Sequence, residues 1–202
     1  MSRDVLERHG THVFVRRPTP RDEGPFLRMT RRSQRFHRPW VHPPLTETHF
    51  TQYLSRFRDP RNVGLLVLSR EDESVVGAIH FNEIVRGLFQ SCYLGYFGSR
   101  DHAGRGWMRE ALGLALHIGF RDLRLHRAEA NIQPENEASI RLVRSLGFRK
   151  EGYSPRYLKI GGRWKDHERW AILSEDWKRP RKGRTTLQTA EVRSQRDTRR
   201  TR

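Results

Sequence analysis

The segment Arg100-Asp-His-Ala-Gly104-Arg-Gly106-Trp-Met-Arg-Glu110 lies between a β-rich run and a run with helical periodicity. Glycine lets backbone amides come close to a ligand, and a helix N-terminus presents free N–H groups that favour phosphate. The third glycine of a dinucleotide fingerprint is missing, and no Gly-Lys-Ser/Thr of a P-loop follows. The segment therefore predicts a phosphate-binding turn of another kind, although the glycine pair by itself is more simply explained as a structural turn.

Outward from this segment, apolar residues recur at strand or helix spacing over most of the chain. Met108, Leu112 and Ala115 follow helical spacing, whereas the two runs before the glycines, 75–85 and 91–98, suggest an antiparallel hairpin. In chain order we expect a strand at 12–16, helices at 22–33 and 47–57, strands at 63–69, 75–85 and 91–98, a helix at 106–120, a strand at 127–132, a helix at 137–146, and strands at 153–160 and 163–173. This order predicts an α/β (α+β) chain with a mostly antiparallel central sheet flanked by helices.

Composition excludes several classes of protein. The 202 residues carry 40 Lys and Arg against 23 Asp and Glu, a formal net charge of +17. The aromatic share of 10% argues against a chain that is disordered throughout. A single cysteine, Cys92, excludes a disulfide framework and is expected to be a small residue of the sheet. No apolar run approaches the length of a membrane span and no secretory signal is visible, so we expect a cytoplasmic protein without a membrane partner.

About half of the positive excess lies in the last 25 residues, where ten Lys and Arg accompany only Glu191 and Asp197. We therefore expect a folded domain over residues 1–177 and a basic, disordered tail over residues 178–202. The tail is either solvated without a partner or a tether to a polyanion such as RNA, since phosphate contacts need only Lys and Arg. A second basic cluster follows the first predicted strand and contains Arg28, Arg31, Arg32, Arg35 and Arg38.

Two motifs resemble the GNAT N-acetyltransferase superfamily. Gly104 and Gly106 fit the family's Gln/Arg-x-x-Gly-x-Gly/Ala loop, although Asp101 stands at its first position. The run 136–148, Asn-Glu-Ala-Ser-Ile-Arg-Leu-Val-Arg-Ser-Leu-Gly-Phe, matches the family's Asn-x-x-Ser/Ala…Leu-Gly-Phe helix. The resemblance implies a GNAT fold with acetyl-CoA as co-substrate, its pyrophosphate cradled by the glycine loop. It also implies that the strand around 130–132 splays from its neighbour and leaves a slot for the pantetheine arm.

Four further segments narrow this resemblance: Pro39-Trp40, the run 85–96, Glu151-Gly-Tyr153 and Gly162-Arg-Trp164-Lys-Asp166-His167. They are similar to the Rim-type ribosomal-protein-alanine N-acetyltransferases of the RimJ kind, over residues 12–177. The resemblance implies an acyltransferase that acetylates the N-terminal Ala or Ser of a ribosomal protein. Given such a substrate, the positive net charge favours ribosomal RNA as a partner of the basic clusters. Two alternatives stay open. One is a GNAT enzyme for a small amine, such as a polyamine or aminoglycoside, and the other is an RNA-binding ribosome-assembly factor with weak catalysis.

The resemblance also implies a set of cofactor-binding residues: Phe97, Gly98, His102, Gly104, Arg105, Gly106, Trp107, Asn131 and Asn136. A backbone N–H in the strand of Phe97 and Gly98 is expected to polarise the thioester carbonyl. Arg105 is expected to add positive charge beside the pyrophosphate. The histidines lack metal-ligand spacing such as His-Glu-x-x-His, so no metal site is expected.

The catalytic groups of related enzymes do not carry over completely. The place of a related Rim enzyme's Glu base falls on Asn131, and the place of the family's Tyr acid falls on Val143. The remaining candidates are Glu83 and Glu129 as bases, and Ser139, Tyr153 and Tyr157 as acids or orienting groups.

Plainer explanations compete with several of these roles. Glu83 can be a solvated strand residue, Glu129 the ion-pair partner of an arginine, and Ser139 a residue that stabilises the start of a helix. Trp40 and Trp164 are more simply explained as packing residues than as walls of a substrate site.

Overall fold

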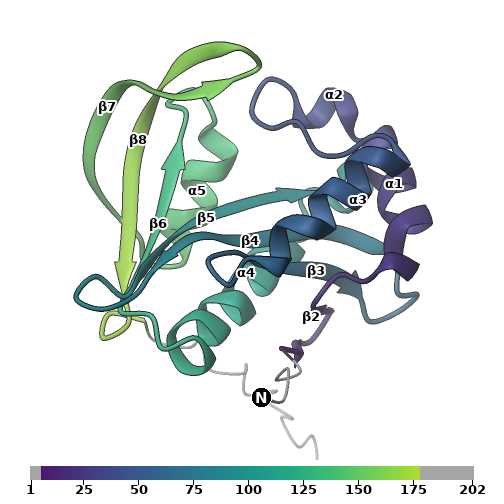
Figure 1. Cartoon of the computed structure of the whole chain (residues 1–202), viewed down its shortest axis with the longest axis horizontal. Coiled ribbons are helices and arrows are strands. Elements are labelled where there is room, and N and C mark those ends of the chain that lie inside the picture. The colour runs from purple at the N-terminus through teal and green to yellow at the C-terminus, as the bar shows by residue number, and fades with distance from the viewer. Residues whose placement is uncertain (1–5, 178–202) are drawn as a thin grey trace, which may run out of the picture.

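The computed structural model describes residues 6–177, so the predicted basic tail lies outside the described residues. Its centre is one eight-stranded sheet in the order β1-β2-β3-β4-β5-β6-β8-β7 (Figure 1). The strands are β1 Arg8–His9, β2 Val13–Arg16, β3 Val63–Ser69, β4 Val75–Val85, β5 Ser91–Gly98, β6 Arg127–Ile132, β7 Arg149–Ile160 and β8 Arg163–Leu173. The α-helices are α1 Glu23–Arg32, α2 Gln34–His37, α3 Glu47–Ser55, α4 Trp107–His117 and α5 Glu137–Ser145. Every paired neighbour in the sheet is antiparallel except β5 with β6.

The bounds of β3, β4, β5, β6 and β8 are those that the sequence predicts, and the differences lie elsewhere. Strand β7 begins at Arg149, four residues before the predicted start, because its first residues are polar and only their pairing with β8 makes them a strand. The helix predicted to reach residue 120 ends at His117 and continues as one π-helical turn, Ile118–Asp122. Strand β1 and helix α2 were missed, since two and four residues are too few to show a period.

Strands β5 and β6 form a fork. They pair in parallel over three residues each, and the last pair joins Tyr93 to Glu129. Beyond this point β5 continues along β4 to Gly98, whereas β6 continues along β8 to Ile132 (Figure 1). The splayed strand pair is thereby confirmed. Backbone N–H and C=O groups need partners, so the edges that face the gap are available to a ligand.

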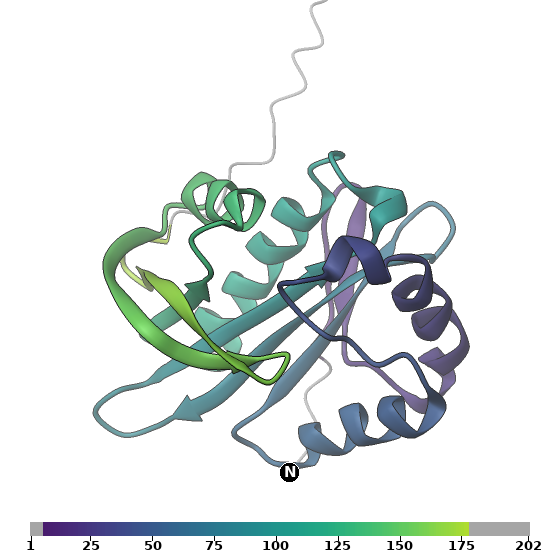
Figure 2. The ribbon, with the colours of Figure 1, turned by 90° about the horizontal axis from the view of Figure 1, so that it is seen from above.

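Two hydrophobic cores lie on opposite faces of the sheet. The larger core packs α4 and α5 on one face, and the smaller core packs α1 and α3 on the other (Figures 1 and 2). Strand β3 is buried on both sides, because Leu65 and Val67 belong to the larger core while Leu66 and Leu68 belong to the smaller. This explains why its sequence is an apolar run and does not alternate.

Leu112 of α4 is fully buried in the larger core, whereas Leu88, in the turn between β4 and β5, is fully exposed. We expect Leu112→Ala to lower the free energy of unfolding by about 2–5 kcal/mol, because it opens a cavity in a packed core. Leu88→Ala removes the same atoms and should change this free energy by less than about 0.5 kcal/mol. Urea unfolding followed by circular dichroism measures both variants. Equal losses would contradict the described packing.

Candidate functional site

The predicted phosphate-binding turn lies between the end of β5 and the start of α4. Gly104 and Gly106 have φ values of +78° and +75°, a left-handed conformation that glycine adopts without steric cost. A Cβ atom built at either glycine would meet no atom within 4 Å, so the outer side of the turn is open. Helix α4 begins directly afterwards at Trp107, and the first N–H groups of a helix have no partner inside it. Together these features form a site for an anion.

Two contacts hold the turn against α1. The Arg100 amide donates to the hydroxyl of buried Ser33 at 3.0 Å, and the Asp101 carboxylate lies 3.4 Å from the Arg32 guanidinium. Asp101 is the residue that departs from the family motif. Because Asp101 is paired with Arg32, its negative charge repels a phosphate at the turn less strongly. The side chains of Arg100 and Arg105 are exposed.

Three of the expected cofactor residues form one wall beside the turn. The His102 ring stacks on Trp107 with centroids 5.0 Å apart, and the Arg105 guanidinium lies 5.1 Å from the Trp107 centroid. Burial is the first cause that lowers the pKa of His102, and the nearby Arg105 charge adds to it. The structure thus brings His102, Arg105 and Trp107 together next to the open glycines.

Amide and hydroxyl groups line the fork itself. The Asn131 Oδ1 atom is buried and has no hydrogen-bond partner within residues 6–177. Asn136 caps α5, where its Oδ1 accepts the Ser139 amide N–H at 3.2 Å, and this leaves the Asn136 NH₂ group for a ligand. The Tyr96 hydroxyl of β5 lies 2.6 Å from Ser139 Oγ. An unpaired buried acceptor costs free energy, so Asn131 suits a ligand that donates an N–H.

A buried histidine holds the end of β5. The His37 Nε2–H of α2 donates to the Gly98 carbonyl at 2.8 Å, and burial lowers the pKa of His37, so the ring is neutral near pH 7. The Phe97 side chain packs edge-on against His37, with centroids 5.3 Å apart, in the smaller core. The Phe97 side chain and the Gly98 carbonyl are therefore already engaged, and a backbone N–H is what this end of β5 can offer a ligand. The sequence did not reveal His37, because the helix that carries it is too short to predict.

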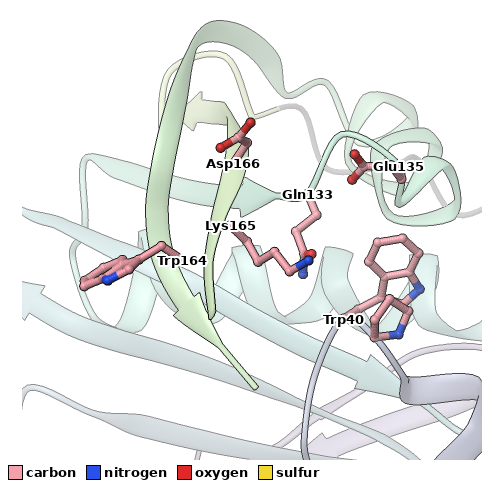
Figure 3. A pocket seen from close by; sticks show the side chains of 7 residues that line it. Trp40, Gln133, Glu135, Trp164, Lys165 and Asp166 are labelled. Atoms are coloured by element: carbon pink, nitrogen blue, oxygen red, sulfur yellow. The ribbon is translucent and has the colours of Figure 1, made fainter. Parts of the chain in front are cut away.

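A cavity of about 420 Å³ lies at the open end of the fork (Figure 3). Three segments line it, namely the loop after α2, the loop after β6 and the start of β8, through Pro39, Trp40, Gln133, Glu135, Trp164, Lys165 and Asp166. Its volume lies in the range of small-ligand sites. Both Trp40 and Trp164 line this cavity, and Trp164 is 61% exposed, so packing alone does not account for Trp164.

Asp166 organises a bulge in β7 beside this cavity. Ser154 pairs with His167 and Leu158 with Lys165, so three residues of β7 lie opposite Asp166 alone. The Asp166 carboxylate accepts the Tyr153 hydroxyl and, at 2.7 Å, the Arg156 amide N–H. The hydrogen bonds from the Tyr153 hydroxyl and from the Arg156 amide lower the pKa of Asp166. The hydrogen bond between Tyr153 and Asp166 also raises the pKa of Tyr153. The candidate acid Tyr153 thus does not line the cavity, and its proton is held by Asp166.

The two candidate bases lie away from the cavity lining. Glu83 is exposed in a bulge of β4, near the hairpin turn and past the closed end of the fork, with its carboxylate 3.7 Å from Arg61. Glu129 occupies the last paired position of β6, and its carboxylate accepts from Arg127 Nε at 2.8 Å. Arg127 also binds Glu151, so the plainer explanation of Glu129 as an ion-pair partner fits the structure.

The single cysteine, Cys92, plays a structural part. Cys92 is buried in the sheet, as predicted, and burial raises the pKa of its thiol to about 12. No cluster of three or more His, Cys, Asp or Glu arranged for a metal ion occurs in residues 6–177. In the same residues, no helix is both long and apolar enough to cross a membrane.

Comparison with known proteins identifies the family. A family model for the acetyltransferase (GNAT) domain matches residues 12–149. The chain belongs to the GNAT acetyltransferase family. A probable N-acetyltransferase of Bacillus subtilis, YjcK, is 36% identical over 126 residues, 62% of this chain and 70% of the relative. The [ribosomal protein uS5]-alanine N-acetyltransferase of Escherichia coli is 41% identical over 107 residues, which are 53% of this chain and 55% of that enzyme.

More distant GNAT relatives include enzymes for other amines. The spermidine N(1)-acetyltransferase of Vibrio cholerae is 26% identical over 111 residues, 55% of this chain and 64% of that enzyme. Among solved structures, Mycobacterium smegmatis RimJ in complex with CoA-disulfide superposes with a TM-score of 0.74 at 28% identity, covering 81% of this chain and 82% of that one.

The residues of the fork fit acetyl-CoA, the co-substrate of GNAT enzymes. The open glycine turn and the exposed arginines suit the pyrophosphate, and the unpaired Asn131 Oδ1 suits an amide N–H of the pantetheine arm. Sequence reasoning missed Tyr96, Gln133, Glu135 and Lys165 as individual site residues. Tyr96 and Lys165 lay inside segments that resembled the Rim-type enzymes, whereas nothing in the sequence marked Gln133 and Glu135.

Gly106→Glu is expected to abolish acetyl-CoA binding, because it places bulk and negative charge beside the diphosphate. Gly87→Glu is the matched control, since Gly87 also has a left-handed φ, +68°, and open space around it but lies in the β4–β5 turn. It should bind acetyl-CoA like the unchanged protein. Isothermal calorimetry measures both affinities, and unchanged binding by Gly106→Glu would contradict the assignment of the glycine turn.

Proposed function

We propose that this GNAT enzyme transfers the acetyl group of acetyl-CoA to the N-terminal α-amine of a ribosomal protein that begins with Ala or Ser. The observation that carries this proposal is the cavity at the open end of the fork, with its two tryptophans and its mixed charge. The resemblance to an enzyme that acetylates an alanine of ribosomal protein uS5 supports it.

The charge of the cavity suits a peptide better than a polycation. Glu135 and Asp166 are its carboxylates, but both Asp166 oxygens already accept hydrogen bonds from Tyr153 and Arg156. Lys165 places a positive charge in the same wall. A polyamine or aminoglycoside carries several positive charges and needs a strongly acidic site, whereas a peptide N-terminus carries one.

The remaining lining residues suit the first residues of a polypeptide. Trp40 offers apolar surface to a small first side chain, and Gln133 can exchange hydrogen bonds with peptide groups. A peptide group that is buried without a hydrogen-bond partner costs free energy. Because the Gln133 amide can supply this partner, it favours a polypeptide over an alkyl amine.

The pKa of the acceptor also favours an α-amine. The amine must be neutral before it attacks the thioester, and an α-amino group titrates near 7.7–8.0 whereas an alkyl amine such as that of lysine titrates near 10.4. An α-amine therefore needs only a modest base or a water molecule. Glu135 is the cavity carboxylate without a hydrogen-bond donor among residues 6–177, and we assign it this role in place of Glu83 and Glu129.

Lys165→Glu tests the charge argument. We expect kcat/KM for a peptide that begins with Ala to exceed that for spermidine at least tenfold in the unchanged enzyme, and Lys165→Glu to reduce this ratio at least fivefold. Lys159→Glu makes the same change in net charge on an exposed part of β7 and should leave the ratio unchanged. Both ratios follow from acetylation rates measured by thiol release.

Three outcomes separate the candidate functions. A preference for spermidine in the unchanged enzyme would overturn the proposal in favour of a small-amine acetyltransferase. Binding of acetyl-CoA without turnover of any amine would favour the ribosome-assembly factor. If both lysine variants keep the preference of the unchanged enzyme for the Ala peptide, only the role assigned to Lys165 is refuted.

The expected partner of the basic clusters is ribosomal RNA in the cytoplasm. In the described residues, the side chains of Arg28, Arg35 and Arg38 are exposed on and after α1 and near the cavity loop that begins with Pro39. The tail 178–202 lies outside the described residues, and its role rests on its net charge of +8, ten basic minus two acidic residues. Tethering to RNA would raise the effective concentration of a protein N-terminus at the active site.

Removal of residues 178–202 should leave acetylation of a free Ala peptide within about twofold and weaken sedimentation with ribosomal particles, since the lost contacts are electrostatic. The association of the full chain should fall steeply with added salt. A tail of equal length with its Lys and Arg replaced by Gln is the matched control and should behave like the truncation. Undiminished sedimentation of the truncated chain would show that the tail is not a tether.

A further inference from the structure

A hydrogen bond crosses from β5 to α5 at the fork. Tyr96 lies on β5 three residues beyond the last residue that pairs with β6, and Ser139 lies in the first turn of α5. Their hydroxyl oxygens are 2.6 Å apart. The cap formed by Asn136 fixes the turn that carries Ser139, so both hydroxyls have defined positions. The proposed function gives no role to either hydroxyl.

The direction of this hydrogen bond follows from its partners. Burial raises the pKa of the Tyr96 phenol to about 12, so the phenol keeps its proton at neutral pH. Within residues 6–177, Ser139 is the hydrogen-bond partner that the Tyr96 hydroxyl has. If Ser139 were the donor, the phenol proton would lie buried without an acceptor, which costs free energy. Tyr96 therefore donates to Ser139 Oγ, and the Ser139 proton is free for another acceptor.

The pair also explains how the chain manages without the family's tyrosine on α5. The place of that tyrosine is Val143, one helical turn after Ser139, and Val143 is fully buried in the larger core. A phenol therefore does not come from α5. The structure brings one to the same helix from β5 instead, on the side of the fork that faces α5.

We propose that Tyr96 is a positioning residue that acts through Ser139 in the departure of the CoA thiol, an inference that rests on the proposed function. The amine nitrogen bonds to the acetyl carbon, the carbon–sulfur bond breaks, and its electron pair stays on sulfur. Glu135 takes the first proton, before the amine attacks. After attack, Ser139 gives its own proton to the sulfur and takes up the second proton, which the nitrogen loses once it is bonded to the acetyl carbon. Tyr96 keeps its own proton and holds Ser139 Oγ in the orientation that allows both transfers, so no further reactant is needed.

A double-mutant cycle tests this role. Tyr96→Phe should lower kcat about tenfold and leave the acetyl-CoA dissociation constant within about twofold, because one hydrogen bond to the acting hydroxyl is lost. Ser139→Ala should lower kcat about 100-fold. In the Ser139→Ala background Tyr96→Phe should have no further effect, whereas in the Ser139→Thr background, which keeps a hydroxyl, its effect should persist.

Tyr53→Phe is the matched control for loss of a buried phenol. Tyr53 is buried on the opposite face of the sheet and its hydroxyl bonds to His80 at 3.0 Å. This variant should keep the kcat of the unchanged enzyme. Rates are measured with the Ala peptide and with hydroxylamine, a small neutral nucleophile that reports cleavage of the thioester whatever the natural acceptor is.

The outcomes distinguish this proposal from the proposed function. Full kcat for Tyr96→Phe with either nucleophile overturns the role of Tyr96 and leaves the proposed function intact. Equal further losses in the Ser139→Ala and Ser139→Thr backgrounds overturn it too, because Tyr96 would then act independently of Ser139. Turnover of hydroxylamine but not of the Ala peptide by the unchanged enzyme overturns the proposed acceptor while Tyr96 remains testable. If the unchanged enzyme turns over neither hydroxylamine nor the Ala peptide, both the proposed function and the role of Tyr96 are overturned.

Discussion

The early end of pairing between β5 and β6 is the constraint on which the site depends. After Tyr93 and Glu129 the two strands follow different neighbours, β4 and β8, so each keeps a full set of partners on its outer side. The gap therefore opens without a large loss of backbone hydrogen bonding, and the edges that face it stay available. The cofactor turn, the Tyr96–Ser139 pair and the cavity all lie beyond this point, which makes the fork the geometric origin of the proposed chemistry.

Charge is distributed along the fork according to what each end must hold. At the glycine turn, Arg32 pairs with Asp101, and the side chains of Arg100 and Arg105 are exposed. At the closed end, Glu129 is paired with Arg127. At the open end, carboxylates and Lys165 share one cavity. A strongly basic chain thus keeps a local site of mixed charge, because distant charges are screened and nearby side chains set the local field.

The β7–β8 hairpin shows how a structural device can shape a binding site. Asp166 holds the bulge of β7 through Tyr153 and Arg156, and the same residue lines the cavity. On β8, the Lys165 side chain points toward Gln133 and Trp40, whereas the Trp164 side chain points to the opposite side of the strand (Figure 3). One carboxylate therefore holds the backbone of the bulge beside the wall of the cavity.

The sequence alone determined the elements with strong local signals. The apolar runs of β3, β4 and β5 and the glycines at 104 and 106 have causes within a few residues, namely burial of alternate or all side chains and a left-handed backbone. The motif around Asn136 and Ser139 was also visible. Only the tertiary structure decided which of these groups meet. Cavity residues such as Trp40, Glu135 and Lys165 come from segments far apart in the chain, and the partner of Tyr96 is 43 residues away. Contacts of this kind depend on sheet order and helix packing, which local sequence patterns do not encode.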